Sequence, residues 1–230
     1  DGLGGIFPAM ANAVMAFRAL GYSAGDPDYA VALASIRKLV VDAFGRHENP
    51  CLISPLLPLL NDPSPNVRAA VAETLGHLRA RVAVPGLIML LGDEPWVRFS
   101  AVAGLAEIGD AAALEPLLQL VKQRDPAVTY AALEAIATLD HEGRALPMLI
   151  DLADSVSPDL QPAFVKTFVA LAERGNSDIW VRLDRARWLR RLTETLQTDE
   201  PEARLAAMTA LGLMGDPSTA RAILDMYAGL

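Results

Sequence analysis

Several residue types that often carry function are scarce in this sequence. Cys51 is the only cysteine among 230 residues, so an intrachain disulfide and a thiolate-rich metal site are excluded. Aromatic residues make up 6% of the chain although 52% of it is apolar, and alanine and leucine dominate. This composition favours close-packed helices over a β-sandwich. The sequence therefore points first to an all-α protein.

Basic residues are also in the minority. The 20 Lys and Arg face 28 Asp and Glu, which gives a net charge of -8, and a field of that sign repels phosphate backbones. Nucleic-acid binding is therefore disfavoured. The longest stretch without a charged residue, residues 2–17, is too short to cross a bilayer. We expect no transmembrane segment and a cytoplasmic location, with which the single thiol agrees.

Candidate catalytic groups are few and scattered. The three histidines, His47, His77 and His141, each stand at a turn expected between helices, and no two of them have a metal-ligand spacing. Cys51 is four residues from His47 but has prolines on both sides, so we expect a buried or inert thiol rather than a nucleophile. No catalytic residue, metal or cofactor is predicted, and the chain is not expected to be an enzyme.

A repeated segment runs through most of the chain. In each copy a proline is followed by an aliphatic residue and then by small and aliphatic residues at helical spacing. Aligning the copies on that aliphatic residue gives spacings of 30, 31, 32 and 43 residues. A period of about 30 to 45 residues is typical of a two-helix repeat. The longer last interval indicates an insertion near residues 176–187. The residues that mark the register are Val67, Val97, Val128, a degenerate Leu160, and Ala203.

Each copy also has signals for the start and the end of a helix. The Asp or Ser before the proline is expected to offer a side-chain oxygen to the free N–H groups of the first turn. Gly76, Gly109 and Gly215 are expected to close the helices, because glycine adopts the left-handed conformation without a steric penalty. A second apolar segment with an early proline then supplies the partner helix, in residues 84–91, 114–121 and 145–152.

The fullest copy of the repeat resembles a known family. Residues 93–110, Asp-Glu-Pro-Trp-Val-Arg-Phe-Ser-Ala-Val-Ala-Gly-Leu-Ala-Glu-Ile-Gly-Asp, are similar to the HEAT-like repeats first named in phycobilisome lyases. The resemblance extends over about residues 52–230 and implies a solenoid of stacked helix pairs. In that family such arrays serve mostly as protein-binding scaffolds, with lyases and a DNA-repair branch as minorities.

The first 55 residues do not follow the repeat. Residues 1–22, from Asp-Gly-Leu-Gly-Gly-Ile-Phe-Pro onward, and residues 50–55 resemble a stretch of bacterial squalene-hopene cyclases, which are built of paired helices. The acidic protonating motif of those enzymes, Asp-x-Asp-Asp, does not occur in this sequence. We therefore predict an N-terminal helical pair in residues 1–50, as a cyclase-like segment or a cap, and a HEAT-like repeat array in residues 51–230.

The predicted architecture is an all-α superhelix, a HEAT-repeat solenoid of about five helix pairs plus the N-terminal pair. Stacked pairs expose a long concave surface, and we expect the second helix of each pair to line it and hold a partner. The contacts expected at or near equivalent places on those helices are Arg68, Arg98, Tyr130, Lys166 and Arg204.

One segment stands out against the acidic background. Residues 180–191 hold five arginines and two tryptophans, the residue types enriched in binding hot spots. This cluster predicts a site for an acidic helix or tail of a partner. The alternative is that the tryptophans fill a gap in the solenoid while the arginines form ion pairs on a solvated face. The residues assigned to binding are Trp180, Arg187, Trp188, Arg190 and Arg191.

The function predicted from these patterns is a non-catalytic scaffold in a bacterial cell that binds a partner protein or peptide. Two alternatives remain open. A lyase-type or terpene-cyclase-related enzyme fragment would need a pocket with converging titratable groups. A nucleic-acid-binding HEAT protein would need a continuous basic groove, whereas the sequence offers one short arginine cluster.

Overall fold

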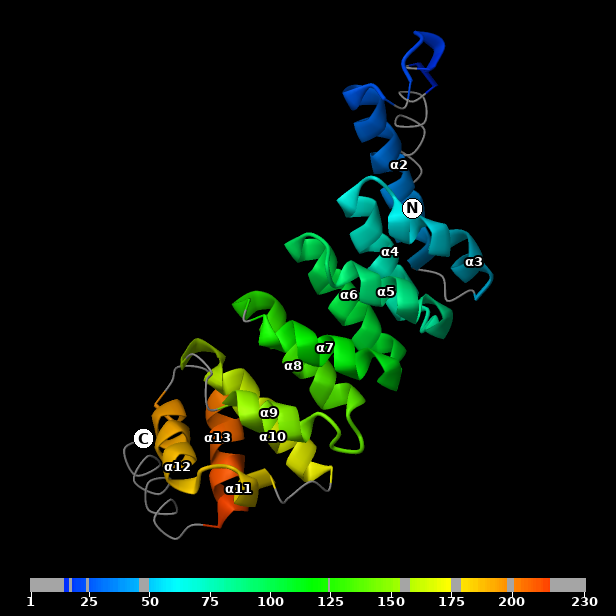
Figure 1. Ribbon diagram of the computed structural model, residues 1–230. Helices are drawn as coiled ribbons and strands as arrows, with labels where there is room; N and C mark the ends of the chain where they lie inside the picture. The colour runs from blue at the N-terminus through cyan, green and yellow to red at the C-terminus, as the bar shows by residue number, and fades with distance from the viewer. Residues whose placement is uncertain are drawn as a thin grey trace. The chain divides into compact units, whose positions relative to one another are not determined.

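The computed structural model is helical throughout the part of the chain that it describes, with no β-strand there, which confirms the predicted all-α fold (Figure 1). The described residues are 15–16, 18–23, 25–45, 50–123, 125–153, 158–174, 179–197 and 201–215. The chain divides into two compact units, Asp1–Asp110 and Ala111–Leu230. No helix in the described ranges is both long enough and apolar enough to span a membrane.

The first unit stacks helices that begin at prolines. Helix α2 packs on α4, α4 packs on α6, and α5 packs against α6. Their apolar faces form the core, in which Val67, Val71, Leu75, Val97 and Leu105 are inaccessible to solvent. The elements are α2 (Pro27–Gly45), η1 (Pro50–Leu52), α3 (Ile53–Leu56), η2 (Leu57–Asn61), α4 (Pro65–His77), η3 (Arg81–Ala83), α5 (Val84–Leu90) and α6 (Pro95–Ile108).

Helices α4 and α6 cross at a pair of glycines. A Cβ atom added to Gly104 would lie 2.6 Å from the carbonyl oxygen of Ala72, and one added to Gly76 would lie 2.6 Å from Cα of Gly104. The prediction that Gly76 closes its helix is therefore wrong. Gly76 lies inside α4 because its missing side chain lets α6 approach, and the left-handed position falls three residues later, on Arg79 with φ of 49°.

The other predicted helix ends meet the structure in different ways. Gly109, with φ of 73°, and Gly215, with φ of 62°, adopt the left-handed conformation as expected. The predicted capping bonds are absent from the first helical turns of α4 and α6, since neither Ser64 nor Glu94 caps through its side chain. Instead the carboxylate of Asp62 accepts a hydrogen bond from the backbone N–H of Ser64, and the carboxylate of Asp93 accepts one from the backbone N–H of Glu94.

The second unit repeats the arrangement. Helix α7 packs on α8, α8 packs on α10, and α10 packs on α13, which also contacts α11 and α12. In this unit the residue before Pro126 again makes no capping bond through its side chain. The elements are η4 (Ala111–Ala113), α7 (Leu114–Lys122), α8 (Pro126–Leu139), α9 (Leu146–Ala153), η5 (Pro158–Leu160), α10 (Gln161–Glu173), α11 (Ile179–Arg182), α12 (Arg185–Thr195) and α13 (Pro201–Met214).

Two organisational predictions fall partly outside the described residues. The insertion predicted near residues 176–187 coincides with the short helix α11 and the start of α12, while residues 175–178 lie outside. Within the predicted N-terminal pair of residues 1–50, α2 is a helix of the first stack, and residues 1–14 lie outside. The boundary at residue 50 therefore stays a prediction.

Candidate partner-binding surface

The five repeat residues predicted to bind a partner lie on different helices from those expected. They belong to the first helix of each pair, the one that begins at the repeated proline, and not to the second. Helices α4, α6, α8, α10 and α13 carry, in that order, Arg68, Arg98, Tyr130, Lys166 and Arg204. All five side chains lie in the first turns of these helices, just after the proline. What surrounds each of them therefore depends on the loop that precedes the first helix of the next pair.

Arg68 links α4 to the loop before α6. Its Nε and Nη2 donate to the two carboxylate oxygens of Asp93, each at 2.7 Å, and its Nη1 donates to the carbonyl of Asp62. Both side chains of the ion pair are only 16% exposed. The hydrogen bond to Asp93 raises the pKa of Arg68 above its ordinary value, and the bond from Arg68 lowers the pKa of Asp93. The side chain of Arg68 is therefore fully engaged in contacts within the chain.

Arg98 is half-buried, and its Nη2 donates to the backbone carbonyl of Asp93.

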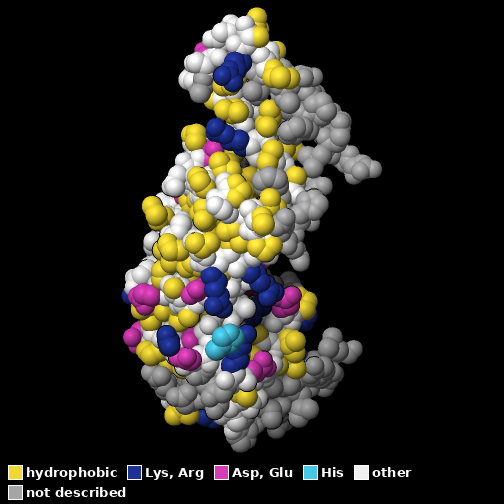
Figure 2. Space-filling view, turned by 90° about the vertical axis from the view of Figure 1, so that its right-hand side faces the viewer, with side chains coloured by type: hydrophobic (Ala, Val, Ile, Leu, Met, Phe, Trp, Pro, Cys, Tyr) yellow, Lys and Arg dark blue, Asp and Glu magenta, His cyan; other side chains and the backbone are white. Residues whose placement is uncertain are grey.

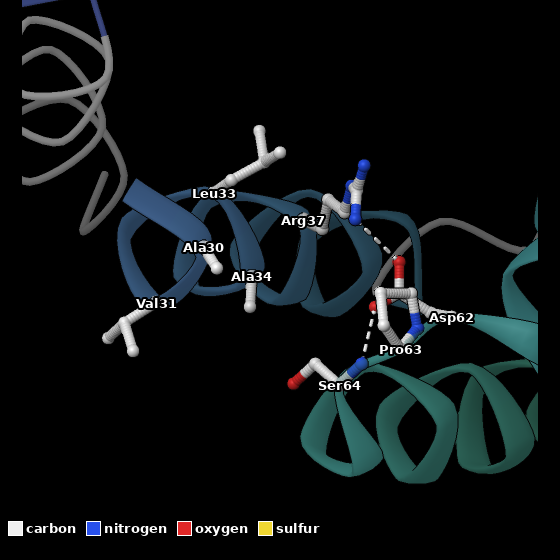
Figure 3. Close-up of a pocket in the computed structure, with 8 residues that line it drawn as sticks. All are labelled: Ala30, Val31, Leu33, Ala34, Arg37, Asp62, Pro63 and Ser64. Carbon is white, nitrogen blue, oxygen red and sulfur yellow. Dashed lines mark hydrogen bonds and ion pairs between the residues drawn. The ribbon is translucent and has the colours of Figure 1, made fainter. Parts of the chain in front are cut away.

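The same device occurs one helix earlier and borders a hollow of about 350 Å³ (Figure 3). Arg37 of α2 donates to the buried carboxylate of Asp62 at 2.9 Å, and that carboxylate also accepts from the N–H of Ser64. Ala30 and Ala34 point from α2 toward the start of α4, so one wall of the hollow is apolar. A space of this size and polarity suits one or two aliphatic side chains.

In the second unit, a lysine joins three first helices. Nζ of Lys166 lies 2.8 Å from the hydroxyl of Tyr130 and 2.8 Å from a carboxylate oxygen of Glu202. Burial lowers the pKa of Lys166, but its hydrogen bonds to Glu202 and Tyr130 outweigh that effect and raise the pKa above its ordinary value. The bond from Lys166 also lowers the pKa of Glu202, which is well exposed. Arg204, two residues after Glu202 on α13, is half-buried.

The two tryptophans of residues 180–191 belong to the core of the second unit. Trp188 is inaccessible to solvent and Trp180 is 3% exposed. Both rings pack edge-on against Phe168, with centroid distances of 5.5 Å for Trp188 and 6.4 Å for Trp180. The prediction that these rings contact a partner is corrected by their burial, which agrees with the structural alternative.

The arginines of the same segment divide into two kinds. Arg191 donates to the carbonyl of Ala153 at 2.6 Å, and its guanidinium lies 5.3 Å from the centre of the Trp188 ring, so it supports the core. Arg187 is half-buried, and its backbone N–H caps α12 by donating to Asp184. Arg190 is exposed, and it is the member of the predicted set that the fold leaves most accessible.

Two exposed aromatic residues in the first unit were not predicted from the sequence. Trp96 and Phe99, in the first turn of α6, are 49% and 54% exposed. The corresponding places on α4 hold Asn66 and Ala69. An available signal was that aromatic residues occupy outward positions of the repeat, where the neighbouring copy has a polar and a small residue. Rings three residues apart share one helix face, so they form a single exposed apolar patch.

The exposed apolar residues are unevenly distributed between the units. On the face drawn in Figure 2, hydrophobic side chains gather over the first unit, whereas charged side chains gather over the second. Among the described residues, the large apolar side chains that are well exposed in the first unit are Met15, Leu20, Tyr22, Val31, Val82, Met89, Trp96 and Phe99, against Val181, Leu205 and Leu213 in the second.

The histidines and the cysteine lie apart from one another. His77 ends α4, where its Nε2 lies 3.5 Å from a carboxylate oxygen of Glu107, and His141 is exposed in the turn after α8. His47 lies outside the described residues. Cys51 is exposed, not buried as one expectation had it, because it lies in the short turn η1. Within the described ranges, no cluster of His, Cys, Asp or Glu is arranged to hold a metal ion.

Comparison with known proteins supports the repeat assignment. A family model described as HEAT repeats matches residues 17–96 and 92–167. The chain is 28% identical over 160 residues to the bilin biosynthesis protein PecE of Mastigocladus laminosus, covering 69% of this chain and 55% of that protein. It is also 51% identical over 41 residues, or 18% of its length, to the squalene-hopene cyclase of Zymomonas mobilis, of which the match covers 6%.

Solved structures agree with the fold. The complex of CpcE and CpcF of phycocyanin lyase from Nostoc sp. PCC7120 superposes with a TM-score of 0.55 at 22% identity, over 87% of this chain and 77% of the other. A designed armadillo repeat protein superposes with a TM-score of 0.60 at 22% identity, over 90% of this chain and 99% of the other. Helix pairs stacked as in armadillo and HEAT proteins are thus confirmed.

The comparisons also correct one prediction. PecE is named for bilin biosynthesis, and the CpcE–CpcF structure is that of a lyase. These names contradict the expectation that this chain is not an enzyme. That expectation rested only on the scattered histidines within the chain. The chain spans about half the length of the curated PecE proteins that it matches, 55% of one and 58% of the other.

Proposed function

The chain belongs to the HEAT repeat family, and from that premise we propose that it binds a partner protein through the exposed face of α6, as part of a lyase-type assembly. The observation that carries the proposal is the exposure of Trp96 and Phe99 side by side on one helix. Tryptophan and other large side chains dominate binding energy when a partner covers them. Stacked helical repeats present such faces on rigid supports.

We propose a separate, polar contact with a partner on the second unit. We assign this contact to Arg204 on α13 and to the exposed Arg190 on α12. An acidic segment of the partner would meet these groups. Charges at the rim of an interface speed association and fix orientation more than they add affinity, so their contribution falls as salt rises. Arg68 is left out because Asp93 holds its guanidinium, and Lys166 is left out because Glu202 and Tyr130 hold its ammonium group.

Two changes of surface residues test the proposal. In capture from an extract of the cells that make the protein, Trp96→Ser with Phe99→Ser is expected to lower recovery of a stoichiometric partner at least tenfold, since two hot-spot side chains are each worth about 2 kcal/mol. Arg190→Glu is expected to weaken capture about twofold to fivefold, with the loss shrinking at high salt.

The matched control is Leu213→Ser, which removes a 45%-exposed apolar side chain from α13. The control should recover the partner as the unchanged protein does, and all variants should keep the helical circular dichroism spectrum. Equal recovery of the partner by the double variant and the control would contradict the assignment of the α6 face.

A second function is favoured by the likeness to PecE. The assembly that we propose would take part in a lyase-type reaction on a bilin, with this chain binding the partner protein. A bilin added to the chain together with its captured partner is expected to change its visible absorption spectrum, because a protein environment fixes the extended pigment in one conformation. A spectrum identical to that of the free pigment, with either protein or with both, would count against this function.

A further inference from the structure

Arg79 holds a backbone conformation that costs free energy. It has φ of 49°, and it is the only residue other than glycine with a positive φ among those described. The remaining left-handed positions in those ranges are held by Gly21, Gly109, Gly143 and Gly215. A side chain with a Cβ atom is disfavoured in this region of φ and ψ, whereas glycine adopts it freely.

The helix end itself does not require an arginine. The backbone N–H of Arg79 donates to the carbonyl of Gly76 at 2.7 Å, and that of Ala80 donates to the carbonyl of Leu75 at 3.0 Å. These two bonds are made by backbone atoms and close α4 in the manner usual for a left-handed residue after a helix. Glycine at position 79 would make the same bonds without the steric cost. Closing the helix therefore does not account for the side chain of Arg79.

The surroundings of Arg79 form a small open hollow. The hollow has a volume of about 330 Å³ and is lined by Pro50, His77, Leu78 and Arg79. Arg79 is exposed, and its guanidinium makes no hydrogen bond or ion pair with any part of the chain that the structure describes. His77 lies in the same hollow, and its Nε2 is 3.5 Å from a carboxylate oxygen of Glu107.

We propose that Arg79 and His77 form a binding site for a carboxylate group carried by a polypeptide. A guanidinium matches the two oxygens of a carboxylate with two parallel N–H donors. Arg79 brings one positive charge to the hollow, and a singly charged carboxylate neutralises it without excess charge. This site would be a second contact with the proposed partner, so the inference rests on the proposed function.

A short acidic peptide tests the site without the partner. Labelled hexaglutamate is titrated with the whole chain at low salt, and its fluorescence anisotropy is followed. Arg79→Gly is expected to weaken binding about fivefold to tenfold, because a charge-assisted pair is lost. The same change is expected to raise Tm by about 2 to 6 °C, because the strained position is relieved. Arg81→Ala, which removes an exposed arginine just outside the hollow, should leave the affinity within about twofold.

Three results would overturn this assignment. Arg79→Gly could bind hexaglutamate as tightly as the unchanged chain, or Arg79→Gly could lower Tm, which would mean that the side chain supports the fold. Inorganic phosphate could displace the peptide at a lower concentration than free glutamate does, which would make phosphate the ligand. Capture of the partner through Trp96 and Phe99 is measured separately, so failure here leaves the α6 face standing.

Discussion

Replacement of Gly104 by valine is expected to destabilise the first unit by about 3 kcal/mol or more, the largest loss we predict for a single added side chain. A Cβ at this position would lie 2.6 Å from the carbonyl oxygen of Ala72 and 3.6 Å from a methyl carbon of Leu87. The first neighbour is backbone inside α4, so it cannot turn aside as a flexible side chain would. Helices α4 and α6 must separate, and the apolar faces between them lose contact.

Urea denaturation followed by circular dichroism measures this effect. The matched control is Gly212→Ala in α13, where an added Cβ would meet no atom within 4 Å. That control is expected to raise the free energy of unfolding by about 0.5 to 1 kcal/mol, because alanine restricts the unfolded chain and favours the helix. Equal stability of Gly104→Val and the unchanged protein would show that the two helices do not cross at these glycines.

Replacement of Trp188 by alanine is expected to cost the second unit about 3 to 5 kcal/mol. Its ring is inaccessible to solvent and packs edge-on against Phe168, with the two ring centres 5.5 Å apart. The guanidinium of Arg191 lies over the same ring. Truncation would leave a large cavity among rigid helices and would remove the support of α12 on the core. Trp188→Ala is therefore expected to lower the stability of the fold, and any loss of partner binding would be a consequence of unfolding.

Thermal and urea unfolding of Trp188→Ala, monitored by tryptophan fluorescence, measures the change. Arg190→Ala is the control, since it removes an exposed residue from the same helix and should alter stability by no more than about 0.5 kcal/mol. If Trp188→Ala folded with native stability yet lost the partner, the ring would be a contact residue after all, and the assignment to the core would fall.

The repeat made most of the fold predictable from the sequence. Prolines mark the starts of α4, α6, α8 and α13, and the apolar residues that follow them are buried where the period places them. The role of Gly76 was not predictable in the same way. A glycine near the end of a helical pattern serves equally well to end the helix or to admit a neighbour, and only the position of Gly104 on the next helix decides between them.

The candidate site was less accessible to sequence reasoning, for a physical reason. The composition of residues 180–191 draws attention to its tryptophans and arginines, but the burial of these side chains depends on what packs against them. Phe168 of α10 packs edge-on against both tryptophan rings. Arg68 likewise looks like a free cation in the sequence, whereas in the structure its guanidinium donates two hydrogen bonds to the carboxylate of Asp93. Trp96 and Phe99 escaped notice because each is ordinary alone, and their importance lies in being exposed together.

Site-specific photo-crosslinking tests most directly whether the α6 face is the binding surface. A photoreactive phenylalanine replaces Trp96 in one variant and Leu213 in another, and both are irradiated in an extract of the cells that make the protein. We expect one prominent crosslinked protein from position 96 and none from position 213. Crosslinking from position 213 alone, or equally from both positions, would contradict this expectation.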